Sequence, residues 1–330
     1  MAAIPVGKHS PLPTLLVTTR TDLSADLLVV ELGKLSAPCV RWNQEDFPLR
    51  SHACWSPDAG EGFVTVGGES YPLSGFRGAW YRRAIPAQLP SGMAEGAIEF
   101  AAREAAIFLE GLWETSHWFW VNRPLRVRAA ENKLAQLALA RHLGFPVPRT
   151  IVTNDPSAAI EFVRSAPQAI VKSVSASRAD VDGDSWALFT HSVSESDLGL
   201  REAVQVAPCI FQECLARKSD VRVTVVGRQV FAAEIFMRGT QSTCEVDWRA
   251  VDRQDLCYQP HNLPPALEAL CHSMLASLEL RYGCFDFIRT ADDRYVFLEV
   301  NPSGQWGWIE HEVGAPITRA LAQLLMEGES

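Results

Sequence analysis

Runs of apolar residues that alternate with polar segments divide this chain into short strands and amphipathic helices. The apolar run Thr14–Thr18 is followed by a helical pattern over Asp22–Leu32 and by a second strand pattern at Pro38–Trp42. Strand, helix and strand at this spacing are typical of a small parallel sheet. Further strands are expected at Phe63–Val66 and Gly78–Arg82, between glycine and proline residues. The first part of the chain therefore predicts an α/β domain.

A longer helix is expected from Ala94 to about Trp113. Its apolar residues recur at steps of three and four, which predicts one buried face. They are Ile98, Ala101, Ala105, Phe108, Leu109 and Leu112. The helix ends near an aromatic cluster formed by Trp113, Trp118, Phe119 and Trp120. We interpret this cluster as core between domains rather than as a platform on which nucleic-acid bases stack.

The second part of the chain begins with a helical pattern over Ala129–Leu143, ended by a glycine with two prolines beyond it. A strand is expected at Arg149–Val152, and the capping residues 154–157 begin another helix. The apolar strand Ala169–Ser173 carries one lysine. It leads into Ser173–Asp184, a polar stretch without periodicity that we interpret as a loop.

The third part alternates strand patterns with two helices over Pro265–Leu280 and Pro316–Met326. The strands, expected to form a largely antiparallel sheet, cover Ile210–Glu213, Asp220–Val226, Gln229–Phe236, Tyr282–Arg289 and Tyr295–Val300. A length of 330 residues suggests two domains or a little more. These patterns divide the chain into three domains, at 1–125, 126–206 and 207–330.

Composition narrows the function classes. With 30 basic against 39 acidic residues the formal net charge is -9, so a protein that binds nucleic-acid phosphates is not expected. No apolar run reaches the roughly 20 residues that span a bilayer, and the first ten residues lack an apolar signal segment. Eight cysteines without a C-x-x-C pair argue against a zinc cluster or a disulfide framework, and most are expected to be small buried side chains. We therefore expect a reduced, cytoplasmic protein with no nucleic-acid or membrane partner.

Three oxygen-bearing side chains near the C-terminus are candidates for a metal site. Asp286 lies in one expected strand, and Glu299 follows 13 residues later in the next, with Asn301 two residues on. Residues i and i+2 of a strand point to one face, so Glu299 and Asn301 converge, and Asp286 can join them from the neighbouring strand. Two carboxylates and an amide oxygen suit Mg²⁺. A strand-end acid beside an unrelated aspartate fits the same pattern, and both interpretations stay open.

Basic residues supply the complementary charge. Lys172 interrupts an apolar strand, where an ammonium group is costly unless an anion meets it. Lys133 lies in the first turn of its helix, where the N-terminus favours anions. Arg222 and Arg238 lie on the two strands before the acids, and guanidinium groups bind phosphate or carboxylate bidentately. Each of these residues, taken alone, fits an ordinary charged side chain at the protein surface. Together they indicate binding of Mg²⁺ and polyphosphate, without a Walker or G-x-G-x-x-G motif.

In this order the motifs resemble the ATP-grasp superfamily of carboxylate–amine ligases, over residues 126 to 326. The motifs are AENKLAQLALARHLGFPVPRT with Lys133, AIVKS with Lys172, FQECLARKSDVRVTVVG, AAEIFMR with Arg238, FDFI with Asp286, and FLEVNPSGQW with Glu299 and Asn301. The resemblance implies an α/β ATP-grasp fold, ATP and Mg²⁺ as cofactors, and two lysines that contact the ATP phosphates. It also implies that Glu213 and the backbone near Leu215 hold adenine and that Asp220 meets the ribose.

A narrower resemblance reaches into the first part of the chain. The segments VRWNQEDFP, GAWYRR, WVNRP and PRTIVTNDP and the ending EVNPSGQWGWIE are similar to graspetide synthetases, ATP-grasp maturases that crosslink ribosomally made peptides. This resemblance implies an N-terminal pre-ATP-grasp domain and a precursor peptide, leader plus core, as substrate. Side-chain carboxylates would be activated as acyl phosphates and closed onto Ser or Thr hydroxyls or Lys amines, giving lactone or lactam rings. A homodimer stays open.

The resemblance also gives roles to arginine and lysine side chains. Lys172 and Arg238 would neutralise charge during phosphoryl transfer, and Arg222 would orient the acceptor carboxylate. Arg82 and Arg83 would bind an acidic leader or assist Arg222, and a solvated strand end is the alternative. Two further function classes stay open. One is a ligase that joins two separate substrates, such as an amino acid to a peptide or small carboxylic acid; the other is a nucleotide-binding scaffold without catalysis.

Overall fold

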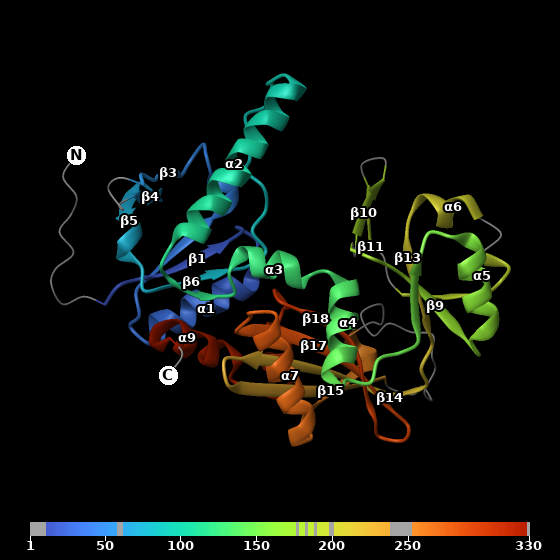
Figure 1. The fold of residues 1–330 in the computed structure, drawn as a ribbon. Helices are drawn as coiled ribbons and strands as arrows, with labels where there is room; N and C mark the ends of the chain where they lie inside the picture. Colours follow the sequence, from blue (N-terminus) through green and yellow to red (C-terminus); the bar gives the residue numbers. More distant parts are fainter. Residues whose placement is uncertain are drawn as a thin grey trace.

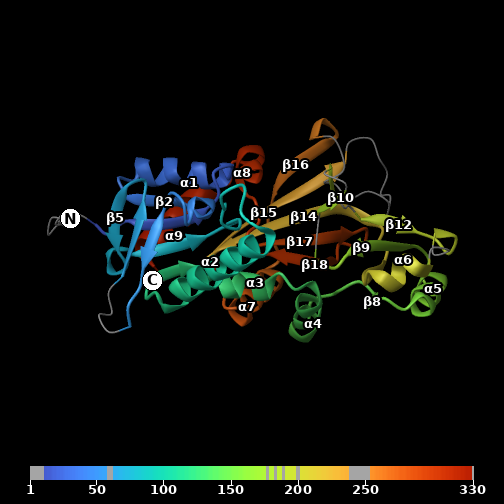
Figure 2. The same cartoon turned by 90° about the horizontal axis from the view of Figure 1, so that it is seen from above.

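The computed structural model describes residues 11–57, 62–175, 178–181, 184–187, 190–197, 201–237 and 253–328. It consists of an N-terminal α/β unit, a small central unit and a larger C-terminal sheet with its helices (Figure 1). The central unit lies at the opposite end of the molecule from the N-terminal unit, and the C-terminal sheet lies between them (Figure 2). The α/β class expected from the sequence is confirmed.

The N-terminal unit is built on the parallel sheet that the sequence predicts. Its strands lie in the order β2 (Cys39–Asn43), β1 (Thr14–Thr18), β6 (Gly78–Tyr81) and β7 (Phe119–Val121). Helix α1 (Leu23–Lys34) begins after Asp22, whose carboxylate accepts a hydrogen bond from the amide of Ser24. A separate antiparallel sheet holds β3 (His52–Cys54), β4 (Phe63–Val66) and β5 (Glu69–Pro72). The parallel strands direct their carboxyl ends to one edge of the unit.

The long helix is α2 (Glu95–Thr115), and only its second half is buried. Ala105, Leu109 and Leu112 pack into the N-terminal core, whereas Ile98 and Phe108 are each 37 % exposed. The first half extends away from the rest of the molecule (Figure 1), and none of its residues before Ala105 is buried. The continuous buried face expected from periodicity was therefore wrong for this half.

The aromatic cluster after α2 is core, but most of it lies within the N-terminal unit rather than between domains. Trp113, Trp118 and Trp120 are nearly fully buried and their ring centroids lie 5.5 to 6.0 Å apart. Phe119 points to the other side of β7 and packs against the core that the N- and C-terminal units share. The alternation of neighbouring strand residues between two faces explains the division.

Two helices replace the single helix expected over 129–143. They are α3 (Pro124–Ala130) and α4 (Lys133–Leu143). The carboxamide of Asn132 accepts hydrogen bonds from the amides of Leu134 and Ala135, so it begins a new helix at the next residue. Gly144 ends α4 in the left-handed region, at φ 95°. This restart places Lys133 at the first position of α4.

The central unit is an antiparallel sheet covered by helices α5 (Pro156–Ser165) and α6 (Arg201–Val206). Its strands lie in the order β12 (His191–Val193), β9 (Ala169–Ser173), β13 (Cys209–Glu213) and β8 (Thr150–Thr153). β13 therefore completes the central sheet, although it follows the boundary expected at 206. The loop expected over 173–184 was wrong in part, because β10 (Arg178–Val181) and β11 (Asp184–Ala187) pair as an antiparallel hairpin.

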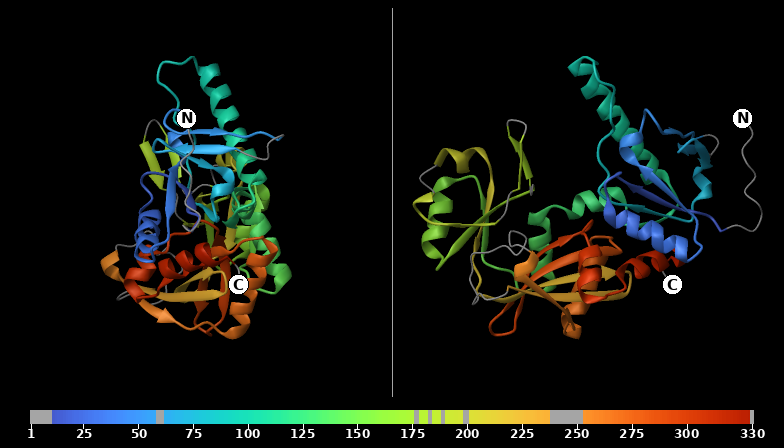
Figure 3. Two further views of the ribbon diagram at one scale, coloured as in Figure 1. Left: turned by 90° about the vertical axis from the view of Figure 1, so that its left-hand side faces the viewer. Right: turned by 180° about the vertical axis from the view of Figure 1, so that it is seen from behind.

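The C-terminal sheet is antiparallel, as expected. Its strands lie in the order β16 (Leu256–His261), β15 (Gln229–Met237), β14 (Arg217–Val226), β17 (Tyr282–Thr290) and β18 (Tyr295–Asn301). One face packs against α4 and α7 (Pro265–Ser277) through Val221, Val223 and Val225. The other packs against α8 (Gly307–Val313) and α9 (Ile317–Glu327). Figure 3 shows helices on both sides of this sheet.

The N-terminal unit and the C-terminal sheet share one hydrophobic core and a buried hydrogen-bond network. Leu28 of α1 and Trp80 of β6 pack in the same cluster as Leu321 of α9. Asn122, directly after β7 and 1 % exposed, donates to the carbonyls of Tyr282 and Pro302 and accepts from two amides of the C-terminal sheet. The carboxyl ends of β6 and β7 are thereby fixed against the turn that follows β18.

Two expectations about cysteines were wrong. Among the described residues only Cys271 and Cys284 are buried free thiols, while Cys54 is exposed and three others are half-buried. Cys214, in the segment after β13, is disulfide-bonded, contrary to the fully reduced state expected.

In the described part of the chain no helix is long and apolar enough to cross a membrane.

Candidate active site

A row of charged residues crosses three strands of the C-terminal sheet. Arg222 of β14 lies directly opposite Asp286 of β17, and Asp286 lies directly opposite Glu299 of β18. Directly opposed residues project to the same face, so the three side chains are neighbours. Asn301, two residues beyond Glu299, lies on this face too, opposite Cys284. The structure thus brings the three expected metal ligands together, and their role as ligands stays a prediction.

Arg222 and Asp286 form a buried ion pair. Nη1 of Arg222 lies 2.8 and 2.7 Å from the two carboxylate oxygens of Asp286, and Nη2 lies 3.5 Å from the carbonyl of Gln305. Burial is the largest single effect and lowers the pKa of Arg222, but the charge and hydrogen bonds of Asp286, together with Cys284 and Tyr282, hold this pKa above its ordinary value. Arg222 is therefore a fixed cation whose position depends on Asp286.

The turn after Asn301 packs closely over this ion pair. The amide of Ser303 donates a hydrogen bond to Oδ1 of Asn301 at 3.0 Å, which orients the carboxamide. A Cβ atom added at Gly304 would lie 2.6 Å from Sγ of Cys284 and 2.8 Å from Nη2 of Arg222. Only glycine allows this approach. Ser303 and Gly304 lie in a segment that carries the family resemblance, but no sequence pattern assigned either residue a role; the Pro-Ser-Gly run beside a candidate ligand was the visible signal.

Lys133 joins the C-terminal sheet to the central sheet. Its Nζ atom donates to the carbonyl of Ser173 at 3.3 Å and lies 4.0 Å from Oε2 of Glu299. Ser173 ends β9, and the half-buried Lys172 precedes it. Lys133 therefore contacts the end of the strand that carries Lys172, at the place where the central sheet approaches Glu299.

The expected nucleotide-binding residues lie where the chain passes from the central to the C-terminal sheet. Glu213 ends β13, and its carboxylate accepts a hydrogen bond from the amide of Arg149 at 2.9 Å. It lines a cavity of about 670 Å³ beside α4. Leu215 is half-buried in the connection to β14. Asp220 is buried on β14 and both of its oxygens lie 3.2 Å from Nη1 of Arg217. Arg238 lies outside the described residues.

The two arginines after β6 occupy different environments. Arg82 is fully buried, pairs with Asp22, and lies 5.1 Å from the ring centroid of Trp306. It can neither bind a leader peptide nor form a solvated strand end, so both interpretations were wrong for it. Arg83 is exposed, has a positive φ of 50°, and its Nε atom donates to the carbonyl of Ser303 at 3.4 Å. Arg83 therefore lies against the turn that covers Arg222.

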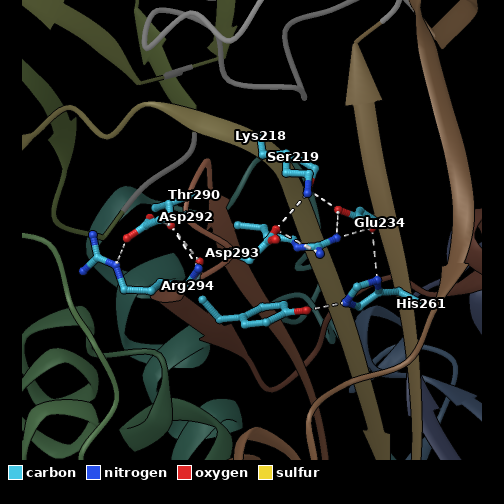
Figure 4. A network of polar contacts seen from close by, with 10 residues as sticks. Lys218, Ser219, Glu234, His261, Thr290, Asp292, Asp293 and Arg294 are labelled. Atoms are coloured by element: carbon cyan, nitrogen blue, oxygen red, sulfur yellow. Dashed lines mark hydrogen bonds and ion pairs between the residues drawn. The ribbon is translucent and has the colours of Figure 1, made fainter.

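A second polar network lies on the opposite face of the C-terminal sheet (Figure 4). Glu234 accepts hydrogen bonds from Ser219 and from Arg289, and it lies 3.1 Å from Nδ1 of His261. Nε2 of His261 is 2.8 Å from the hydroxyl of Tyr295. Since Glu234 lies between the serine and the histidine, this arrangement cannot activate the serine as a nucleophile. We interpret it as a structural network.

The donor set around Glu299 is made of oxygen atoms. Within the described ranges no group of three or more His, Cys, Asp or Glu residues could hold a metal ion. The expected ligand set of Asp286, Glu299 and Asn301 has only two carboxylates, and its third oxygen belongs to an amide. Such all-oxygen sets suit Mg²⁺ rather than zinc.

Comparisons with known proteins cover nearly the whole chain. Residues 14–128 match the family model for the MvdD pre-ATP grasp domain, and residues 130–325 match that for the RimK-like ATP-grasp domain. No curated protein matches the sequence.

Three solved structures that are similar to this chain cover most of its length and of their own. The first is macrocyclase MdnC from Microcystis aeruginosa MRC bound with precursor peptide MdnA, with 28 % identity and a TM-score of 0.84 over 96 % of this chain and 100 % of that one. The second is a RiPP-associated ATP-grasp ligase of Chryseobacterium gregarium in complex with ADP and a leader and core peptide, with 26 % identity and a TM-score of 0.85 over 95 % and 96 %. The third is macrocyclase MdnB from Microcystis aeruginosa MRC, with 29 % identity and a TM-score of 0.81 over 96 % and 100 %.

Proposed function

This chain belongs to the RimK-like ATP-grasp family and is an ATP-dependent ligase, and we propose that it makes macrocycles in a ribosomally made precursor peptide. Side-chain carboxylates of the peptide are closed onto Ser or Thr hydroxyls or Lys amines, which gives lactone or lactam rings. The likeness to MdnC and to the Chryseobacterium gregarium ligase, whose structures hold a precursor peptide and a leader and core peptide, supports a peptide substrate.

The row of Arg222, Asp286 and Glu299 carries the proposal. It puts a fixed cation and two carboxylates on one sheet face, and Lys133 reaches the same place from α4. Phosphoryl transfer needs positioned charge and few covalent steps from the protein. The reaction joins two anions, a carboxylate and a polyphosphate. In this row the guanidinium would attract the carboxylate, and the neighbouring acids would hold the metal cation that binds the polyphosphate.

Asp286, Glu299 and Asn301 are the residues that would hold Mg²⁺. Their oxygens fit the ion, since Asn301 is already oriented by the Ser303 amide and all three side chains project from one face. The bound ion would supply positive charge to the β- and γ-phosphates. We assign Lys133 and Lys172 to the phosphates of ATP, whose negative charge would be met by both lysines when the ion and the nucleotide are bound.

The remaining residues bind the nucleotide or orient the substrate carboxylate. Glu213 and the backbone at Leu215 hold the adenine, and Asp220 contacts the ribose. Arg238 adds positive charge at the phosphates. Arg222 orients the acceptor carboxylate, because its guanidinium is held by Asp286 and cannot turn away.

The reaction balances without a redox step. An oxygen of the peptide carboxylate attacks the γ-phosphorus of ATP, ADP leaves, and an acyl phosphate remains. The hydroxyl or amine then attacks the carbonyl carbon, inorganic phosphate leaves with the carboxylate oxygen, and the nucleophile loses a proton. Each ring therefore costs the peptide one water molecule.

The test incubates the protein with ATP, Mg²⁺ and a candidate precursor peptide, a short reading frame rich in Thr, Ser, Asp, Glu or Lys that is sought beside its gene. Mass spectrometry should find the loss of one water per ring, and fragmentation should give no backbone cleavage products inside the ring. Glu299→Gln should abolish the loss while the circular dichroism spectrum stays unchanged. Glu312→Gln is the matched control, an exposed acid on α8 that should react as the wild type does.

Two outcomes would contradict the proposal. A peptide that keeps its mass in the presence of ATP and Mg²⁺ would exclude ring formation. In a parallel incubation with free amino acids added, a peptide that instead gains the mass of one amino acid less water would identify a ligase that joins two separate substrates.

A further inference from the structure

Three arginine side chains contact one short turn of the backbone. The turn follows Asn301, and its carbonyls accept from each arginine in succession. Nε of Arg83 is 3.4 Å from the carbonyl of Ser303, Nη2 of Arg82 is 3.5 Å from that of Gly304, and Nη2 of Arg222 is 3.5 Å from that of Gln305. The turn therefore lies at the meeting point of the N-terminal and C-terminal units.

Two of the three arginines are neutralised. Arg82 pairs with Asp22 with both side chains almost fully buried, and Arg222 pairs with Asp286. Arg83 has no carboxylate partner among the described residues, and its one hydrogen bond there is the long one to Ser303. The turn is thus surrounded by three cations and two of their counterions, so one positive charge stays available to a ligand.

The position of Arg83 is held rather than free. It follows β6 at the carboxyl end of the parallel sheet, the edge where open α/β sheets bind ligands. Its φ of 50° is uncommon for a residue with a side chain and costs conformational energy, which the surrounding structure must offset. Arg83 is exposed as a residue, but its guanidinium is partly desolvated, and this desolvation and the charge of Arg82 lower the pKa of Arg83.

We propose that Arg83 binds the side-chain carboxylate that the enzyme activates, from the N-terminal side of the turn, opposite to Arg222. This inference rests on the proposed function and adds a substrate-binding residue to it. Both oxygens of Asp286 already bind Nη1 of Arg222. Arg222 can therefore contact the substrate carboxylate only with the part of its guanidinium that does not face Asp286. Arg83 supplies the open guanidinium fork that a carboxylate needs for two parallel hydrogen bonds.

The test measures binding of two short peptides that differ in one group. The probe is a pentapeptide with a single glutamate, blocked at both ends so that this side chain is its only anion, and the second probe has glutamine instead. Titrations with ADP and Mg²⁺ present should give the wild type roughly tenfold tighter binding of the glutamate peptide. Arg83→Gln should bind both peptides with the lower affinity, and Arg83→Lys should keep part of the preference.

Arg77→Ala is the matched control, because Arg77 is an exposed arginine at the other end of the same strand. It should keep the full preference for glutamate. Equal binding of the two peptides by the wild type, or an unchanged preference in Arg83→Gln, would overturn the inference.

The inference and the proposed function can fail separately. If the wild type prefers the glutamate probe through Arg83 but removes no water from the candidate precursor peptide, the carboxylate site stands and macrocyclisation does not. If rings form equally fast with Arg83→Gln, macrocyclisation stands and Arg83 is not the carboxylate-binding residue.

Discussion

The buried pair of Arg222 and Asp286 gives the sharpest prediction about stability. Their side chains are 8 % and 13 % exposed, and both oxygens of Asp286 lie within 2.8 Å of one guanidinium nitrogen. Removing one member of such a pair leaves the other charge in a site with little water. We therefore expect Arg222→Met or Asp286→Asn to lower the free energy of unfolding by about 3–5 kcal/mol each.

The double substitution should cost much less than the two single ones together, because neither charge is then left alone. The coupling energy should reach about 2–3 kcal/mol in a double-mutant cycle. Urea unfolding followed by circular dichroism measures each free energy.

An exposed ion pair between β14 and the turn after β17 serves as the control. Lys218 and Asp293 are 43 % and 55 % exposed and lie 2.8 Å apart. Their coupling should be far smaller than that of the buried pair, since water screens both charges and Asp293 also pairs with Arg289. Equal coupling in the two pairs would refute the view that Arg222 is fixed by a desolvated contact, and with it the orienting role we assign to Arg222.

Three further predictions concern other parts of the molecule. Asn122→Ala removes four buried hydrogen bonds between β7 and the C-terminal sheet and should lower the free energy of unfolding by roughly 3 kcal/mol in the same urea assay; a loss near zero would contradict the interdomain role. Burial opposes the charge of Glu234, but hydrogen bonds from Ser219 and Arg289 outweigh it and hold the pKa of Glu234 below its ordinary value. The ionised Glu234 therefore contributes fully to the free energy of unfolding above pH ~4.5, and this contribution is lost as the pH falls further. Glu234→Gln should flatten the acid limb of a curve of stability against pH. An unchanged acid limb would exclude Glu234 as the source of this pH dependence. Lys172→Ala should weaken binding of a fluorescent ADP analogue roughly tenfold while Lys218→Ala leaves it unchanged, and equal affinities would remove Lys172 from the nucleotide site.

The local pattern was enough to predict many elements and the convergence of the acids. Strands at 14–18, 63–66 and 169–173 agree with the structure to the residue. The two-residue repeat of a strand placed Glu299 and Asn301 on one face, and hairpin pairing placed Asp286 opposite Glu299. These features depend on residues that are close in sequence.

Features that depend on distant residues could not be predicted. Arg82 is buried because Asp22 neutralises it and Trp306 covers it, and these lie 60 and more than 200 residues away. Pro260 made β16 hard to recognise, since proline lacks the amide that a ladder requires, yet β16 lies at the sheet edge where this loss is tolerated. The exposure of the first half of α2 depends on what lies beside it in space, which periodicity does not report.

The most direct test of carboxylate activation follows one oxygen atom. The candidate precursor peptide is prepared with ¹⁸O in its Asp and Glu side-chain carboxylates and is incubated with the enzyme, unlabelled ATP and Mg²⁺. If each carboxylate becomes an acyl phosphate, every ring formed transfers one ¹⁸O atom to inorganic phosphate, which mass spectrometry detects. If rings form while the phosphate contains no ¹⁸O, the carboxylate was not the phosphorylated group and the central claim is wrong.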